Sequence, residues 1–305
     1  FADMKLTQDL SSITEGLGAF VRVGYDNIAN IYENHSKTYV YSVNAPTWTD
    51  GAAEPTVKTS TYGEDSEMGS DAKINTFNRR LHFDVGFNYQ RTFGDHSIYS
   101  QLKWDYENHD PNGINNTVNR QNFTWWSHYG YKNRYFVDLA LVESASNRLA
   151  PGTKWNFSPT LSAAWVLSKE NFMEDATWID FLKLRASAGI INVDNLPGDE
   201  VWAYYAQQYA TSGGGYAFDS GWNSEFGRTY LGMMATANPT NEKAYKYNVG
   251  VDAKFFGGLD VTLDLWKEHR TDIWVTSDGK YSAVLGMDTP YENAGVVDSW
   301  GVELG

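Results

Sequence analysis

Alternation of apolar and polar residues is the feature of this sequence that most constrains its fold. Residues 81–89 place Leu, Phe, Val, Phe and Tyr at odd positions and His, Asp, Gly and Asn at even positions. Residues 245–255 and 259–266 follow the same pattern. Because successive side chains of a strand point to opposite faces, each segment has one apolar face and one polar face. The pattern predicts β-strands that meet water on one face only.

One segment also indicates what the apolar faces meet. In residues 123–131 the apolar face carries large aromatic residues at both ends and the small Ser127 in the middle. Trp and Tyr rings settle at the two headgroup levels of a bilayer, so this pattern is typical of a strand that crosses a membrane. We therefore expect an aromatic girdle that contacts lipid. Its predicted members are Phe123, Trp125, Tyr129, Tyr131, Trp165, Tyr245 and Tyr247.

Eleven strand-like segments can be marked along the chain. At about 3.3 Å per residue and a tilt of about 40°, a strand of ten residues or slightly more spans about 25 Å, which is the height of the apolar band of an outer-membrane barrel. The segments lie at residues 1–9, 18–29, 78–91, 97–108, 121–131, 134–144, 156–168, 181–191, 244–256, 258–270 and 296–305.

The connections between these segments alternate in length. Short connections are followed by long ones, and only the connection at residues 168–180 is intermediate; we expect a brief helix there, capped by Ser168. Outer-membrane barrels place short turns in the periplasm and long loops outside the cell. The long connections are expected at residues 30–77, 109–120, 145–155, 192–243 and 271–295.

An odd number of strands indicates an incomplete barrel, because single-chain bacterial barrels have even numbers. The largest outer-membrane transporters have 22 strands, so about eleven strands represent roughly half of one. No linker or composition shift divides the chain. We therefore predict an all-β fold, an antiparallel transmembrane β-barrel, of which residues 1–305 are one part.

Composition excludes several function classes. The net charge of −14 argues against a basic stripe that binds nucleic acid. There is no cysteine, so no disulfide or cysteine-based metal site is expected, and the six His residues lack ligand spacing. No catalytic motif is present, and paired carboxylates such as Asp105 and Glu107 fit a hydrated barrel wall. The sequence predicts neither an enzyme nor a metal or other cofactor.

Several stretches resemble one family. Residues 146–155 read Ser-Asn-Arg-Leu-Ala-Pro-Gly-Thr-Lys-Trp, residues 156–165 read Asn-Phe-Ser-Pro-Thr-Leu-Ser-Ala-Ala-Trp, and residues 182–189 read Leu-Lys-Leu-Arg-Ala-Ser-Ala-Gly. They resemble the barrel of SusC-like (SusC/RagA) TonB-dependent outer-membrane transporters. Shorter matches, among them Asn-Val-Gly-Val-Asp-Ala at 248–253, occur in order along the chain, although residues 142–148 lack the family's Arg-Asp pair.

The resemblance implies import of oligosaccharides, or of peptides, across the outer membrane of a Gram-negative bacterium. It implies a SusD-like surface lipoprotein as an extracellular lid and energy supplied by the TonB complex. The family's plug domain, TonB box and C-terminal strand are not recognised in residues 1–305. Outer-membrane lipid is the remaining expected partner, and the substrate itself is not identified by the resemblance.

Aromatic residues in the long connections are candidate substrate contacts. Sugar faces stack on flat rings, while Asn, Asp and Gln satisfy hydroxyl groups; the alternative is that these rings pack the loop on itself. Residues 30–77 are expected to meet the lipoprotein. The candidates are Trp202, Tyr204, Tyr205, Tyr216 and Trp222, with Trp48 as a further one.

Inward-facing charges have two open interpretations, since they could bond to a plug or simply face water. These charges are Asp84, Lys103, Arg185, Asp252 and Asp264. Two other kinds of protein also remain possible from the residues alone. One is a passive porin or adhesin barrel, and the other is a soluble carbohydrate-binding β protein or glycoside hydrolase.

Overall fold

The computed structural model describes residues 1–111, 117–195, 209–212, 228–277 and 279–305. Within them the chain forms one eleven-stranded antiparallel sheet in which sequential strands are neighbours. The predicted all-β fold and its eleven strands are confirmed. The strands are β1 (Ala2–Asp9), β2 (Leu17–Ser36), β5 (Gly69–Phe93), β6 (His96–Asp110), β7 (Val118–Tyr131), β8 (Tyr135–Ser146), β9 (Trp155–Val166), β10 (Ile179–Val193), β13 (Glu242–Phe255), β14 (Leu259–Thr276) and β15 (Tyr291–Leu304).

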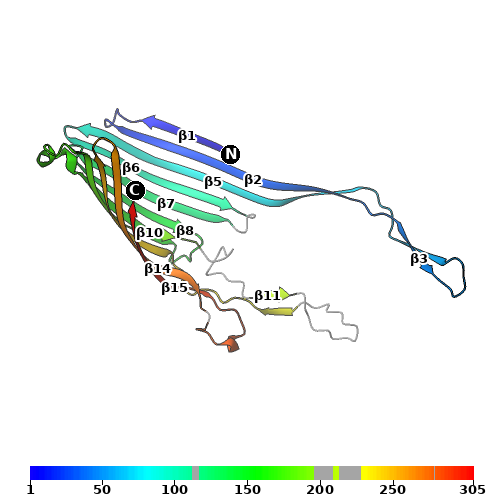
Figure 1. The fold of residues 1–305 in the computed structure, drawn as a ribbon. Coiled ribbons are helices and arrows are strands. Elements are labelled where there is room, and N and C mark those ends of the chain that lie inside the picture. Colours follow the sequence, from blue (N-terminus) through cyan, green and yellow to red (C-terminus); the bar gives the residue numbers. More distant parts are fainter. Residues whose placement is uncertain (112–116, 196–208, 213–227, 278) are drawn as a thin grey trace.

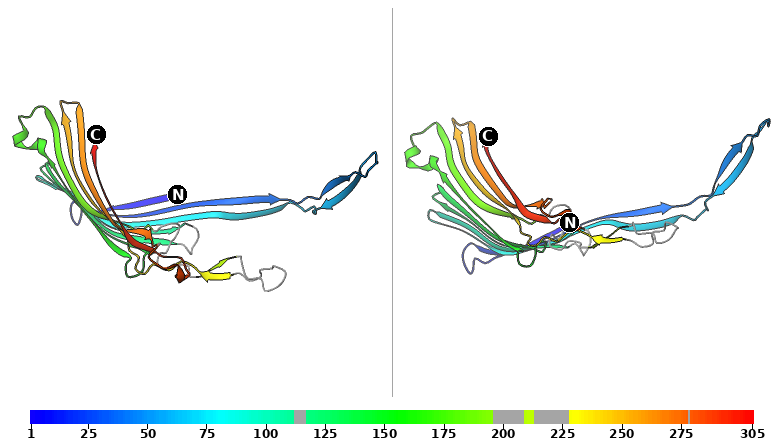
Figure 2. Two further views of the ribbon diagram at one scale, coloured as in Figure 1. Left: turned by 60° about the horizontal axis from the view of Figure 1, so that its bottom comes forward. Right: turned by 90° about the horizontal axis from the view of Figure 1, so that it is seen from below.

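The sheet is curved into a trough and is not closed, because β1 and β15 end it on opposite sides (Figures 1 and 2). This is the shape of a partial barrel. Short turns lie at one end of the strands, which we call the short-turn end, and the longer connections lie at the other, the long-loop end. In the β7–β8 turn, Lys132 and Asn133 have φ values of +52° and +51°. A two-residue turn of type I′ requires positive φ at both positions, and it matches the twist of the paired strands.

The connection expected at residues 30–77 is largely strand instead. β2 runs on to Ser36 and pairs with β5 from Gly69, and a further hairpin, β3 (Tyr41–Thr47) with β4 (Thr56–Tyr62), extends it. Together residues 30–77 form an arm that projects far beyond the sheet (Figure 1). Nearly every side chain of the arm is exposed on both faces. Without a buried face there is no alternation to mark the strands, which is why the predicted boundaries were wrong here.

The remaining elements are small. β11 (Tyr209–Ser212) pairs with β12 (Arg228–Leu231) in a second hairpin. The brief helix expected at residues 168–180 is a pair of 3₁₀ turns, η2 (Leu167–Lys169) and η3 (Asn171–Met173). Ser168 lies inside η2, so its predicted capping role was wrong: the chain turns directly from the end of β9. A third 3₁₀ turn, η4 (Ala283–Leu285), precedes β15.

No helix in the described part of the chain is long and apolar enough to cross a bilayer.

Candidate functional site, a polar wall opposite an apolar face

Strand register sorts the side chains of the sheet into two faces. Paired residues of neighbouring strands share a face, so a row can be followed from strand to strand. On one face, which we call the inner wall, the register aligns polar and charged residues. On the opposite face, which we call the outer face, the next row is apolar. One such wall row is Arg22, Asp84, Asp105 and Asn122, and the neighbouring outer row is Val21, Val85, Trp104 and Phe123.

Exposure of the two faces is the reverse of that in a water-soluble sheet. Asp84 and Asp105 on the inner wall are only 6% and 7% exposed, whereas Phe87 and Leu102 on the outer face are 51% and 57% exposed. Side chains converge on the hollow side of a curved sheet and lose exposure there, so the inner wall lines the trough. A band of exposed apolar side chains on the convex side is the arrangement of a strand that faces lipid.

Charges on the inner wall are paired with one another. The Arg185 guanidinium reaches from β10 across β13 to β14, where its Nη1 and Nη2 donate to the two Asp264 carboxylate oxygens at 2.5 Å each. Its Nε donates to Asp252 at 3.1 Å. Gly250 lies between these side chains in the register, and a Cβ at Gly250 would lie 2.6 Å from the Arg185 guanidinium carbon. The glycine therefore leaves the space through which the arginine crosses.

The same pairing holds near β5 and β6. The His82 ring lies 2.6 Å from Asp84, and Lys103 lies 2.9 Å from Asp105. Asn122 donates a further hydrogen bond to Asp105 at 2.6 Å. The five inward charges expected from the sequence thus all lie on the inner wall. Lys103, Arg185, Asp252 and Asp264 each have a partner of opposite charge there, and Asp84 lies against the His82 ring. Whether they also meet a plug stays a prediction.

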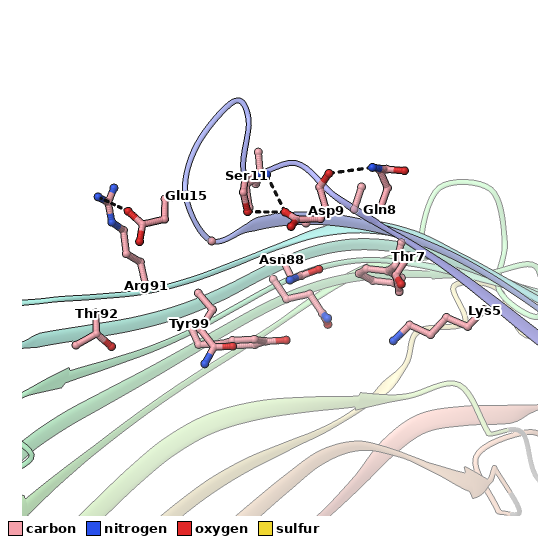
Figure 3. Close-up of a pocket in the computed structure, with 17 residues that line it drawn as sticks. Lys5, Thr7, Gln8, Asp9, Ser11, Glu15, Asn88, Arg91, Thr92 and Tyr99 are labelled. Atoms are coloured by element: carbon pink, nitrogen blue, oxygen red, sulfur yellow. Dashed lines mark hydrogen bonds and ion pairs between the residues drawn. The ribbon is translucent and has the colours of Figure 1, made fainter.

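A polar recess of about 770 Å³ lies on the inner wall at the short-turn end of β1, β2, β5 and β6 (Figure 3). Lys5, Thr7 and Tyr99 are among the side chains that line it. Lys5 places its ammonium 5.3 Å from the centre of the Phe20 ring, whose residue is 8% exposed. The recess has hydroxyl, amide and ammonium groups, together with the Asp9 carboxylate and an ion pair of 3.0 Å between Glu15 and Arg91. Among the described residues, no group of three His, Cys, Asp or Glu side chains could hold a metal ion.

Aromatic rings form a connected series along the short-turn end of the outer face. Tyr131 stacks on Tyr135 with ring centres 6.3 Å apart, Tyr135 stacks on Trp165 at 6.1 Å, and Trp165 meets Phe172 at 6.4 Å. Glu170, between η2 and η3, fixes two of these rings by hydrogen bonds. The Tyr135 hydroxyl and the Trp165 indole N–H donate to its Oε1 at 2.6 and 3.0 Å. These hydrogen bonds, first that from Tyr135, hold the pKa of Glu170 below its usual value.

All seven predicted girdle residues lie on the outer face. The strand register places Tyr129, Tyr131 and Trp165 at the short-turn end and Tyr245 and Tyr247 toward the long-loop end, whereas Phe123 and Trp125 lie near the middle of β7. Their role as lipid anchors stays a prediction.

Two aromatic residues that the sequence reasoning missed join these rings. Trp155, at the long-loop end of β9, stacks on Phe123 with ring centres 6.1 Å apart, and Tyr135 joins the series at the short-turn end. Residues 155 and 165 end β9, and about 3.3 Å per residue at a tilt of about 40° separates the two rings by about 25 Å across the sheet. Tyr135 begins β8 and Trp155 begins β9. Their stacking partners lie on other segments of the chain, so this stacking could not be predicted from one segment alone.

The candidate substrate contacts Trp202, Tyr204, Tyr205, Tyr216 and Trp222 lie outside the described residues. Trp48 lies between β3 and β4 at the tip of the arm and is 66% exposed. It contributes to neither the inner wall nor the girdle.

An ion pair secures the long-loop end of the wall. Asp194 follows β10, and the Arg120 guanidinium of β7 donates to its two carboxylate oxygens at 2.8 and 3.2 Å. Glu107 accepts a third hydrogen bond from Arg120 at 3.3 Å. Burial acts to raise the pKa of Asp194, but the hydrogen bonds from Arg120 and Ser146 outweigh it and hold the pKa below its usual value. The sequence gives no signal for this pair, because 74 residues separate its members.

No family model matches the chain, but several curated proteins are similar to it. The TonB-dependent receptor P39 of Formosa agariphila is 25% identical over 262 residues, which cover 75% of this chain and 23% of the receptor. The TonB-dependent receptor SusC of Bacteroides thetaiotaomicron is 28% identical over 185 residues, which cover 58% of this chain and 17% of SusC. These relatives are named as receptors rather than enzymes, and the chain spans less than a quarter of their length.

Solved structures share the fold. The RagAB peptide transporter matches with a TM-score of 0.66 at 13% identity, over 95% of this chain and 32% of the other. The RagAB peptide importer in its closed-closed state matches with a TM-score of 0.68 at 13% identity, over 99% and 33%. The two-faced eleven-stranded sheet and these relatives together support the resemblance of this chain to the barrel of SusC-like TonB-dependent transporters.

Proposed function

We propose that this chain forms part of a barrel that imports oligosaccharides across the outer membrane of a Gram-negative bacterium in a TonB-dependent manner. The observation that carries the proposal is the inner wall of paired charges opposite an exposed apolar face. Such a sheet, continued by further strands, encloses a hydrated pore that is surrounded by lipid. The SusC-like relatives supply the energy-coupled transport class.

Residues 1–305 are in this proposal one part of a longer barrel domain, and the plug domain, TonB box and remaining strands belong to other parts of the protein. Two observations support it. The matched region covers only 23% of receptor P39 and 17% of SusC. The edge strands β1 and β15 have no partner on their outer sides within the described residues, and a barrel in a membrane leaves no backbone edge unpaired.

The arm is the proposed contact with a SusD-like lipoprotein. An isolated two-stranded ribbon is only marginally stable in water, and the arm carries exposed apolar side chains such as Ile31 at 70% and Trp48 at 66%. A partner that covers the arm would remove this surface from water. The solved RagAB assemblies, whose fold this sheet shares, contain two proteins by their name.

The geometry of the wall suggests how ligand passes. Arg185 is held by Asp252 and Asp264, Lys183 lies 3.3 Å from Asp252, and Lys103 is held by Asp105. Three cations and three carboxylates therefore offer a neutral, hydrated surface rather than a strong charged site. A neutral sugar chain can exchange hydrogen bonds with water along such a wall without being trapped. Specific binding is then left to the long loops, where Trp202, Tyr204, Tyr205, Tyr216 and Trp222 remain proposed substrate contacts. The TonB complex would act on the plug and not on this sheet.

Peptides are the second candidate substrate, and the named substrate of the RagAB neighbours favours them. Uptake of labelled oligosaccharide and labelled peptide should be compared in a strain with the full-length gene deleted and then restored. We expect the restored gene to return oligosaccharide uptake only when TonB is present. Uptake that persists without TonB would indicate a passive porin, and extraction of the protein into buffer without detergent would contradict the membrane assignment altogether.

The loop aromatics need their own test. Trp202→Ala and Trp222→Ala should each weaken binding of the imported ligand, measured by calorimetry on the purified full-length protein. Trp48→Ala tests the further candidate on the arm in the same way. Trp178→Ala, in the short connection before β10 and 52% exposed, is the matched control and should leave affinity unchanged. Unchanged affinity in both Trp202→Ala and Trp222→Ala would remove these residues from the proposed site.

A further inference from the structure

A groove of about 590 Å³ lies on the outer face near the short-turn end. Ala163 and Ala186 pair across β9 and β10 and form its shallow part. The neighbouring side chains are large and exposed: Trp165 at 36%, Leu184 at 39% and Val249 at 56%. Methyl groups among much longer side chains leave a slot in an otherwise apolar band. Such a slot accepts an apolar chain and rejects polar groups, which would lose their hydrogen bonds there.

Cations gather at the end of this groove. Lys132 and Arg134 flank Asn133 in the turn that leads into β8, whose first residue, Tyr135, lines the groove. The Lys169 ammonium lies at the same turn, because it donates to the Asn133 carbonyl oxygen at 3.1 Å. Three basic side chains from two different turns therefore converge at the short-turn end. In an outer-membrane barrel this end lies at the headgroups of the periplasmic leaflet.

One of these three cations has no carboxylate partner. Glu170 accepts from Arg134 Nη1 at 3.1 Å, and Asp95 lies 3.6 Å from Lys132. Lys169 instead donates to a neutral carbonyl, and Glu174 and Asp175, which follow in the same connection, lie within 4 Å of none of the three cations. Lys169 is therefore able to accept a further anionic partner. A phosphodiester carries one negative charge and offers oxygen acceptors to ammonium groups.

We propose that the groove and the cationic turn together form a binding site for one phospholipid molecule. An acyl chain lies over Ala163 and Ala186, and the phosphate lies beside Lys132 and Lys169. The site is continuous with the lipid-facing band. The rings of Tyr135 and Trp165, whose polar atoms bind Glu170, mark the level where chain meets headgroup. Charge complementarity and this continuity single out a phospholipid over a protein helix, which would bring no phosphate to the turn.

Such a lipid is held at a fixed place, unlike the fluid lipid around the rest of the band. Neither part of the site suffices alone, since free phosphate lacks the chain and an uncharged lipid lacks the phosphate. Each lysine near an anionic lipid contributes about 1 kcal/mol. Loss of both lysines is therefore expected to weaken retention about 30-fold.

Native mass spectrometry of the full-length transporter tests the site. The detergent-purified protein is stripped of lipid and offered phosphatidylglycerol or uncharged diacylglycerol at equal concentration. We compare the parent protein with Ala186→Phe, which fills the groove, and with the double variant Lys132→Gln and Lys169→Gln. Ser127→Phe adds the same bulk elsewhere on the outer face and is the matched control. Folding of each variant is checked by its migration on unheated gels.

The expected result is one retained phosphatidylglycerol on the parent and on Ser127→Phe, at least tenfold less on Ala186→Phe, and about 30-fold weaker retention on the double lysine variant. Diacylglycerol should bind poorly to all four. Equal retention by all four proteins would mean general annular lipid and would overturn the proposal. So would the absence of retained phospholipid on the parent, or equal binding of diacylglycerol. Each outcome is independent of the imported substrate.

Discussion

The ion pair between Arg120 and Asp194 should control how easily the long-loop end of β10 opens. β10 pairs with β9 only as far as Gly189, although it continues to Val193. Beyond that point it keeps β13 on one side. On the other side, Asn192 Nδ2 donates to the Phe157 carbonyl oxygen and to Ser158 Oγ, at 2.8 Å each, and the Arg120 hydrogen bonds to Asp194, at 2.8 and 3.2 Å, add the attachment toward β7. The substitution Asp194→Asn removes the charge and leaves the shape nearly unchanged.

The magnitude follows from partial burial. Hydrogen bonds to charged groups contribute about 1.5–3 kcal/mol, and the bidentate arrangement places the pair toward the stronger end. Exposed side-chain fractions of 30% for Arg120 and 17% for Asp194 reduce this, and Arg120 keeps its bond to Glu107 after the substitution. We expect a loss of about 2 kcal/mol, which corresponds to about 30-fold more frequent opening.

Hydrogen exchange of the detergent-solubilised full-length protein measures this opening directly. In Asp194→Asn the amides of residues 190–194 should exchange about 30-fold faster at pH 7, while those of residues 182–188 should not change. Asp260→Asn is the matched control, because this carboxylate is 75% exposed and 3.8 Å from Lys254 and such pairs contribute little. Unchanged exchange at residues 190–194, or equal acceleration in every strand, would refute the reasoning.

Acid should abolish the difference between the two proteins. The folded-state pKa of Asp194 lies below its usual value, so the pair contributes fully above the unfolded pKa, which is about 3.9. The contribution is lost as pH falls through the folded value. The roughly 30-fold difference should therefore persist at pH 5, decrease as the pH falls below the unfolded pKa of about 3.9, and disappear once the pH is below the folded-state pKa.

Further predictions concern the two faces. Leu102→Arg on the outer face should cost about 2–4 kcal/mol and sharply lower the yield of assembled barrel on unheated gels, whereas Gln101→Arg on the inner wall should assemble normally; equal yields would contradict the assignment of faces. Gly250→Val should destabilise the sheet by about 1–3 kcal/mol through overpacking against Arg185, read as a lower melting temperature by circular dichroism. Gly152→Ala, which meets no atom within 4 Å, should melt as the parent does. In a protein with Trp165 as its only tryptophan, fluorescence should be quenched more by lipids brominated near the headgroup than by lipids brominated at mid-chain, and equal quenching would remove Trp165 from the girdle.

The eleven strands could be predicted because lipid and water impose opposite demands on alternate residues. In residues 81–89 and 259–266 this contrast is strong enough to be read from one segment. The arm could not be predicted, since Ile31 and Tyr32 are both exposed and neither face selects for polarity. The wall pairs could not be predicted either: Arg185 meets Asp264 across 79 residues, and only the register brings Gly250 between them.

The pairing on the wall has a consequence for selectivity. If the wall alone chose the ligand, some charge on it would be left to bind one, yet Arg185 already has two carboxylates and Lys103 already has Asp105. Removing water from these pairs to bind a ligand would cost free energy, because their charges would lose hydration. If the proposed function is right, such a wall stays hydrated while neutral chains pass. Discrimination between oligosaccharide and peptide would then come from the long loops, so loop substitutions should change which ligand is imported, while wall substitutions such as Asp264→Asn should change the stability of the sheet.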